Sequence, residues 1–208
     1  MIRQKRNRED PVVRRAQILD EALRIIGEQG FHGFTIQQLS ARCGMSNAGL
    51  LHYFASKDVL LAAVLAEIEA RQVQIIAPLV AEVEARIAAG NASLADVRSF
   101  FRAIIARTAE EHALGPFLLV VQAESIDSGH PAHVYFQGAE DAAIALYARL
   151  LAGYCADTHV LARSIHAMMI GLAQQWYRSG TRLDVLAIWD RAMDLLLPDI
   201  AAPSGRDT

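Results

Sequence analysis

The sequence predicts an all-α protein of about nine helices, and three observations support this fold class. Ala, Leu, Ile, Glu and Arg dominate the 208 residues, and these residue types favour helices. Apolar positions recur at helical spacing, whereas runs that alternate apolar and polar residues are scarce. Because 53% of the residues are hydrophobic and 21% are charged, the chain can bury a core and is not disordered as a whole.

The first helix is predicted to follow Asp10 and to end at Gly30. Asp10 is a suitable N-cap, and Pro11 occupies the first helical position, where proline is well tolerated. Glycine ends helices because it accepts a left-handed backbone conformation.

Two short helices follow, joined by a tight turn. Thr35 and Gln38 have the spacing of a capping box, which begins a helix that ends at Gly44. Ser46 can cap the next helix, which continues through Tyr53. Two short helices joined by a short glycine-containing turn indicate a helix–turn–helix.

Longer helices make up the rest of the chain. Ser56 can cap a helix that extends to about Ala89, in which we expect a kink or break at Pro78. We expect Thr181 to cap the last helix. Beyond the long helix, the predicted helices cover approximately residues 94–111, 116–127, 132–154, 158–178 and 183–197.

The charge of the chain is unevenly distributed. The net charge is −3, but the first 65 residues carry +3 and the remainder −6. A basic end on an acidic body suits a protein that presents that end to a polyanion, although a solvated basic tail is the alternative.

No apolar run approaches the roughly 18 residues of a membrane span, and no apolar segment follows the basic start, so we expect a cytoplasmic protein. Cys43 and Cys155 are expected to be small buried residues.

Motifs typical of enzymes are missing from the sequence. No glycine-rich phosphate loop, Ser-His-Asp pattern, HExxH or paired-carboxylate motif stands out, so we expect neither an enzyme nor a cofactor. His130 and His133 are three residues apart, but no cluster of Cys, Asp and Glu completes a metal site, and we expect no metal.

Several N-terminal segments together form a known pattern. They are RAQILDEA at 15–22, GF at 30–31, TIQQL at 35–39, CGMS at 43–46 and GLLHYFASKD at 49–58. Over about residues 12–65 the sequence resembles the DNA-binding domain of the TetR family of bacterial regulators. The resemblance implies an N-terminal helix–turn–helix domain and a larger C-terminal domain that binds a small molecule and dimerises.

The resemblance makes residues 46–53, from Ser46 onward, the recognition helix. Its exposed N-terminal residues should face base edges in the major groove. Asn47 can bond N6 and N7 of adenine together, and Ala48 and Gly49 would allow close approach or touch a thymine methyl. Gln37 on the preceding helix is a second base or phosphate contact.

Phosphate contacts are implied for the Thr35 hydroxyl, Tyr53 and Lys57. Many relatives have Tyr-x-His-Phe where this chain has Leu-His-Tyr-Phe, which leaves open whether His52 or Tyr53 makes the contact. A disordered basic arm could also reach DNA, with simple solvation as the alternative. It contains Arg3, Lys5, Arg6 and Arg8.

The family resemblance also implies an effector site in the C-terminal domain, and we expect an apolar or aromatic effector that releases a repressor from DNA. Core packing is the alternative role for each candidate pocket residue. The candidates are Phe100, Phe101, Phe117, Gln122, Tyr147, Met169 and Trp176.

The last two helices are apolar on more than one face, which favours burial against a second subunit of a homodimer. The alternative is that they complete the core of a single subunit. Such a dimer would bind two half-sites of a two-fold symmetric operator in double-stranded DNA. The candidate interface residues are Leu161, Ile165, Met168, Leu172, Val185, Trp189, Met193 and Leu196.

The sequence therefore favours a DNA-binding transcription regulator over a dimeric helical adaptor without specific DNA binding, or a helical enzyme. The predicted organisation is a disordered basic arm at 1–9, the helix–turn–helix domain at 10–56, the regulatory and dimerisation domain at 57–200 and a tail at 201–208.

Overall fold

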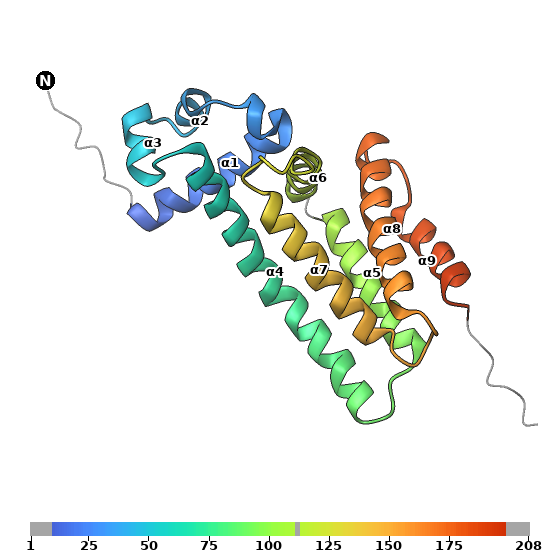
Figure 1. The fold of residues 1–208 in the computed structure, drawn as a ribbon. Helices are drawn as coiled ribbons and strands as arrows, with labels where there is room; N and C mark the ends of the chain where they lie inside the picture. Colours follow the sequence, from blue (N-terminus) through green and yellow to red (C-terminus); the bar gives the residue numbers. More distant parts are fainter. Residues whose placement is uncertain (1–9, 111–112, 199–208) are drawn as a thin grey trace, which may run out of the picture. The chain divides into compact units, whose positions relative to one another are not determined.

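The regular elements of the protein are α-helices (Figure 1). The computed structural model describes residues 10–110 and 113–198, so the predicted arm and tail lie outside the described residues. The all-α prediction is confirmed, and no helix in these ranges is long and apolar enough to cross a membrane. The helices are α1 (Pro11–Gly33), α2 (Ile36–Arg42), α3 (Asn47–Tyr53), α4 (Lys57–Ala88), α5 (Leu94–Glu110), α6 (Leu114–Glu124), α7 (His133–Leu150), α8 (Thr158–Arg178) and α9 (Val185–Leu196).

The chain forms two compact units. The N-terminal unit combines the residues up to Ala70 with the segment Pro116–Val134, and the C-terminal unit contains Arg71–Gly115 and the residues from Tyr135 onward. This division differs from the predicted boundary at residue 56. The first part of α4, up to Ala70, belongs to the N-terminal unit, and α6 packs beside α1 in the same unit. A Cβ atom on Gly27 of α1 would lie 3.0 Å from the backbone nitrogen of Phe117 in α6.

The first helix begins as predicted but ends later. The Asp10 carboxylate accepts a hydrogen bond from the Val12 amide at 2.8 Å, and Pro11 follows the cap. Gly30 has a φ of +77° and interrupts the helical backbone, yet one further helical turn continues to Gly33. The glycine therefore kinks the element instead of terminating it.

Helix α4 is continuous through Pro78, so the predicted break is absent. A proline removes one intrahelical hydrogen bond, and a helix of 32 residues retains its other hydrogen bonds on both sides.

The last helix begins later than predicted, and its cap is different. Asp184, not Thr181, accepts the capping hydrogen bond, from the Ala187 amide at 3.0 Å. Thr181 has a φ of +61°, a left-handed conformation that belongs to the turn before the helix.

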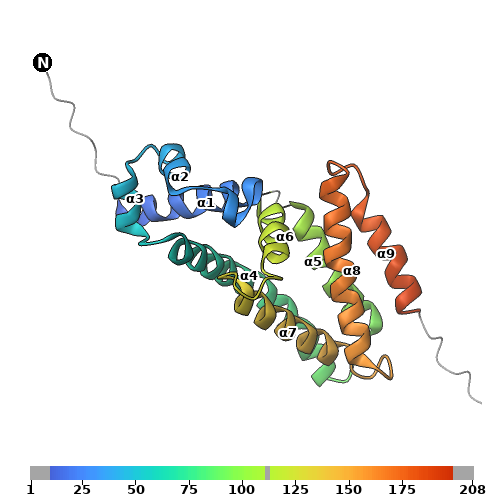
Figure 2. The same ribbon diagram turned by 45° about the horizontal axis from the view of Figure 1, so that its top comes forward.

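The C-terminal unit has one continuous apolar core. Figures 1 and 2 both show α5, α8 and α9 lying side by side, and α7 supplies the ring of Tyr147 to the same core. Phe101 is completely buried, and Trp189 is 1% exposed. This core buries one apolar face of each of the last two helices.

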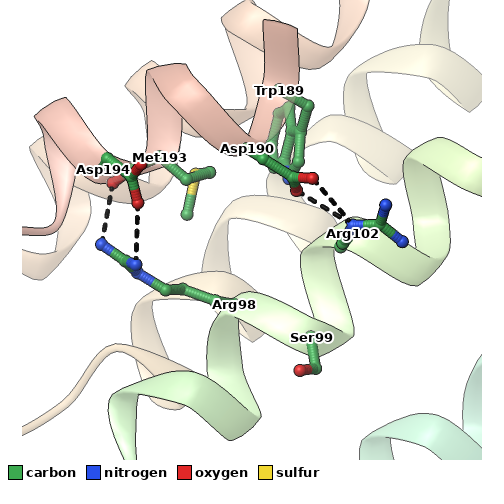
Figure 3. A pocket seen from close by; sticks show the side chains of 7 residues that line it. All are labelled: Arg98, Ser99, Arg102, Trp189, Asp190, Met193 and Asp194. Carbon is green, nitrogen blue, oxygen red and sulfur yellow. Dashed lines mark hydrogen bonds and ion pairs between the residues drawn. The ribbon is translucent and has the colours of Figure 1, made fainter. Parts of the chain in front are cut away.

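Two ion pairs join α5 to α9 beside a surface hollow of about 290 Å³ (Figure 3). Arg98 Nη1 lies 3.1 Å from Asp194 Oδ1, and Arg102 Nε lies 3.0 Å from Asp190 Oδ1. Arg98 also donates to the backbone carbonyl of Leu197, which follows the last turn of α9. Carbonyls at a helix C-terminus lack intrahelical donors, so Arg98 fastens this end of α9 to α5.

Replacing Trp189 by alanine tests whether α9 belongs to the core of a single subunit. We expect Trp189→Ala to lower the free energy of unfolding by about 3–5 kcal/mol, because it leaves a large cavity between helices. Chemical denaturation followed by circular dichroism measures this change. Val12→Ala is the control, since Val12 is 76% exposed and should be nearly neutral. Equal stabilities of the two variants would contradict the assignment.

Candidate nucleic-acid interface

The predicted helix–turn–helix is present as α2 and α3. The Thr35 hydroxyl accepts from the Gln38 amide at 3.1 Å, and the Gln38 side chain accepts from the Thr35 amide at 2.8 Å, which confirms the capping box. Gly44 has a φ of +62° in the turn, and the Ser46 hydroxyl accepts from the Gly49 amide at 3.1 Å. Local capping thus sets both ends of the turn.

Helix α3 has one buried and one exposed face. Leu50 is fully buried, whereas Tyr53 is only half-buried. The sequence analysis did not include Leu51, whose side chain is 43% exposed and could meet a thymine methyl. Helical spacing from Asn47 would have found it, because residues four apart share a face. The exposed positions of α3 are Asn47, Ala48, Leu51 and His52.

The Asn47 side chain is held by a buried hydroxyl. Ser40 of α2 is 3% exposed, and its Oγ lies 2.5 Å from Asn47 Oδ1 and 3.0 Å from the carbonyl oxygen of Gln37. A side chain that is already oriented loses less conformational entropy when it binds. Asn47 and Gln37, both exposed, are therefore linked through one internal group.

Gly49 has a structural explanation within the chain. A Cβ atom at this position would lie 3.2 Å from Ser46 Oγ and 3.4 Å from the Met45 methyl. The absence of a side chain therefore lets the Ser46 hydroxyl approach the Gly49 backbone. A close approach of DNA would be a second reason for glycine at this position.

The structure gives Lys57 a role that the sequence analysis did not predict. Its ammonium donates to the carbonyl oxygens of Phe31 at 2.6 Å and Phe34 at 2.8 Å and lies over both aromatic rings. Burial lowers the pKa of Lys57 from its ordinary value. The ammonium is thus directed at backbone within the unit, where a phosphate contact would require it to turn away.

A backbone amide in the same stretch of chain also has a side-chain partner. Residues 30–34, which we call the connector, lead from α1 into α2. The Phe31 amide donates to Glu124 Oε2 of α6 at 2.8 Å. A Cβ atom on Gly30 would lie 2.5 Å from Glu124 Oε1, so this carboxylate can approach only because residue 30 is glycine. Glu124 and Lys57 therefore clamp the connector from α6 and α4.

Other basic residues of the N-terminal unit are neutralised by α1. Arg42 pairs with Glu28 at 2.6 Å and with Glu21 at 3.2 Å, and the hydrogen bond to Glu28 is the main cause that raises the pKa of Arg42. Arg15, in contrast, is exposed and lies with its guanidinium carbon 5.2 Å from the centre of the Phe54 ring, at the end of α3. The sequence analysis did not single out Arg15 as a phosphate contact.

The predicted pocket residues do not form one group. Phe117 is buried and Gln122 half-buried in the N-terminal unit. The Tyr147 ring lies 5.0 Å from that of Phe101 between centres, and burial raises the pKa of Tyr147 to about 12. The candidates in the core of the C-terminal unit are Phe100, Phe101, Tyr147, Met169 and Trp176.

His166, which the sequence analysis did not single out as a pocket residue, lies beside this aromatic group. Its ring centre is 6.2 Å from that of Tyr147, and burial lowers the pKa of His166. Neither ring nitrogen has a hydrogen-bond partner in the described part of the chain. The Tyr147 hydroxyl meets only the Met169 sulfur, at 3.7 Å, among the hydrogen bonds assigned to it. The core thus contains polar groups that are poorly satisfied.

Residues 10–110 and 113–198 contain no group of three His, Cys, Asp or Glu side chains able to hold a metal. Cys43 and Cys155 are free and half-buried.

Most predicted interface residues are buried in the subunit itself. Leu161 and Met168 are half-buried, and Leu196 is 39% exposed. Side chains already covered by their own chain have little area left for a partner, which favours core packing within one subunit for the buried ones. These are Ile165, Leu172, Val185, Trp189 and Met193.

Comparison with known proteins identifies the N-terminal part of the chain. Residues 18–64 match the family model described as bacterial regulatory proteins, tetR family. The HTH-type transcriptional regulator BetI of Serratia proteamaculans is 43% identical over 51 residues, and BetI of Escherichia coli is 41% identical over 56 residues. These matches cover 24% and 27% of this chain, and it spans 26% and 29% of the length of those relatives.

Solved structures of regulators share the fold over most of the chain. A TetR-like regulator from Rhodococcus sp. RHA1 has a TM-score of 0.70 and 23% identity, covering 91% of this chain and 96% of that one. AibR in complex with isovaleryl coenzyme A and operator DNA has a TM-score of 0.69 and 19% identity, covering 89% of this chain and 98% of that one. FadR from Bacillus subtilis in complex with stearoyl-CoA has a TM-score of 0.65 and 16% identity, covering 89% of this chain and 99% of that one.

Replacing Lys57 by methionine tests its structural role. We expect Lys57→Met to lower the free energy of unfolding by about 1.5–3 kcal/mol, because the carbonyl oxygens of Phe31 and Phe34 lose a charged donor. Thermal and urea denaturation measure the loss. Arg42→Met is the control and should cost much less, since its ion pairs are exposed to water. A fully stable Lys57→Met protein would show that the ammonium is free for other contacts.

Proposed function

Because the chain belongs to the TetR family of bacterial regulatory proteins through its N-terminal domain, we propose that it is a sequence-specific DNA-binding transcription regulator. The observation that carries the proposal is the exposed face of α3 beside the turn that follows α2. Asn47, Ala48, Leu51 and His52 are available to base edges there, and Ser40 orients the amide of Asn47. The protein acts by binding and not by catalysis.

The proposal includes repression that a small molecule relieves. The C-terminal unit offers an aromatic core beside His166, whose ring nitrogens have no hydrogen-bond partner in the described part of the chain, and this suits an effector that is largely apolar with one polar group. Acyl thioesters of coenzyme A are a second candidate class, because two regulators of the same fold are described with isovaleryl and stearoyl thioesters. Free coenzyme A is the matched control in a screen of both classes.

A homodimer is part of the same proposal, and the exposed residues of α8 and α9 are its best candidates. Val160 is 61% exposed, Ile188 38% and Leu195 76%. Ile188 and Leu195 are seven residues apart and share one face of α9. This face replaces the buried residues in the predicted interface.

DNA binding is tested by titrating the protein into labelled DNA from the region upstream of its own gene, against a scrambled sequence of equal length. We expect preferential binding that weakens steeply between about 50 and 200 mM salt. Asn47→Ala should lower the preference by about 1–3 kcal/mol, because it removes a bidentate base contact. Asn91→Ala is the matched control, since Asn91 is exposed in the turn after α4. No binding to either DNA at the lower salt concentration would contradict the proposal and favour the helical adaptor.

Dimerisation is tested by placing a charge on the exposed face of α9. We expect Leu195→Glu to dissociate the dimer at micromolar concentration, because two-fold symmetry places the new carboxylate twice in a desolvated interface. Sedimentation velocity measures the mass. Val134→Glu is the control, because Val134 is 77% exposed but lies in the N-terminal unit. A Leu195→Glu protein that remains dimeric would exclude this face.

A further inference from the structure

A buried histidine lies against the connector. His130 follows α6, and none of its side chain is exposed. Its ring centre lies 5.1 Å from that of Phe31 and 5.4 Å from that of His32, edge to face in both cases. The imidazole is therefore packed on the end of α1, where the chain turns toward α2.

The hydrogen bonds of His130 define where its protons lie. Nδ1 accepts from the Ala132 amide at 3.2 Å, so the proton of the neutral ring lies on Nε2. Nε2 has no hydrogen-bond partner in the described part of the chain and lies 3.9 Å from Glu124 Oε2. A buried donor thus points toward a carboxylate that is just beyond hydrogen-bond distance.

The oxygen that faces this donor already has a partner. Glu124 Oε2 accepts from the Phe31 amide at 2.8 Å, so one oxygen lies between the imidazole and the connector backbone. A charged imidazole that draws Oε2 within hydrogen-bond distance would therefore compete with the Phe31 amide for the same oxygen. If the Phe31 amide loses Glu124, Lys57 is the clamping residue that remains, through its bonds to the connector carbonyls.

Several charged and titratable groups act on His130. Burial is the largest influence and lowers the pKa of His130 below 6.5, and His32 of α1 lowers it further. Glu124 of α6, Asp127 of the following loop and Asp58 of α4 act in the opposite direction. Lys57 of α4 faces Glu124 from the other side. His133 of α7 contacts the Ser125 carbonyl through Nδ1 at 2.8 Å.

The direction of this shift has a consequence for stability. The unfolded chain takes up a proton on this residue near pH 6.5, before the folded chain does. The contribution of neutral His130 is therefore complete above pH 6.5 and is lost as the pH falls below it.

We propose that His130 and Glu124 form a proton-sensitive switch that releases the connector, and with it the helix–turn–helix, in mild acid. A proton added at Nδ1 removes the acceptor of the Ala132 amide and makes the ring a cation. The cation then attracts Glu124 Oε2 into a charge-assisted hydrogen bond with Nε2–H, and the Phe31 amide loses its acceptor. The effect on DNA rests on the proposed function, whereas the rearrangement at Phe31 does not.

The sequence offers a direct probe of this rearrangement. Gly30-Phe31 and Gly33-Phe34 are the Gly-Phe pairs of the chain, and both lie in the connector. Labelling the full-length protein with carbonyl-¹³C glycine and ¹⁵N phenylalanine therefore isolates their two amide signals in a nuclear magnetic resonance experiment.

We expect the Phe31 amide signal to move as the pH falls below about 6.5, with the same midpoint as the His130 ring. It should stay fixed in His130→Gln, and also in Glu124→Gln, which keeps an acceptor for Phe31 but no charge. His133→Gln is the matched control and should titrate like the unchanged protein. A fixed Phe31 signal in the unchanged protein, or the same movement in His130→Gln, would overturn the proposal. The Glu124→Gln arm decides the question if His130→Gln does not fold.

DNA binding over the same pH range tests the functional link. We expect the unchanged protein to lose affinity for its operator about fivefold or more relative to His130→Gln on acidification. The exposed residues of α3 are the same in both proteins, so the comparison isolates the effect of residue 130. Identical pH dependence would overturn the link to DNA. If neither protein binds DNA at neutral pH, the proposed function fails, while the Phe31 signal still decides whether the switch exists.

Discussion

The arrangement of the N-terminal unit depends on how the connector, the last turn of α1 and the residue that follows it, is held before α2. The connector begins at Gly30, whose φ of +77° interrupts the helical backbone of α1, so that backbone groups there need other partners. Lys57 satisfies the Phe31 and Phe34 carbonyls, and Glu124 satisfies the Phe31 amide. These contacts come from helices that begin 26 and 83 residues after Phe31. The position of α2 and α3 relative to α1 is thus set by side chains outside the helix–turn–helix itself.

Local chemistry made part of this structure predictable from the sequence. The capping box of Thr35, the caps at Asp10 and Ser46 and the glycine turn at Gly44 involve residues within a few positions of one another, and all are present. The roles of Lys57 and Glu124 were not predicted, because their partners are distant in sequence and a lysine before an acidic residue resembles any exposed helix start. Arg42 was likewise unremarkable in the sequence until α1 placed Glu21 and Glu28 beside it.

The C-terminal unit shows a different limit of sequence patterns. Apolar residues on two faces of α8 and α9 indicate that two surfaces are covered, but not which surface faces the chain's own core. Here Trp189 and Met193 face α5, and Arg98 binds the end of α9 from the same side. The exposed Ile188 and Leu195 occupy the other face. The pattern therefore predicted burial, but it could not tell which residues pack in the subunit's own core and which are left for a partner.

The discontinuity of the N-terminal unit limits how its DNA-binding part can be exchanged between relatives. A hybrid regulator joined directly after Phe54 would carry α1, α2 and α3 but would take α6 from another protein. The glycine at position 30 would then face an unrelated side chain, and the Phe31 amide would lose its acceptor. Recombination that preserves the unit must transfer residues 116–134 together with those up to Ala70. The module that evolution or an engineer can shuffle intact is therefore two separate stretches of one chain.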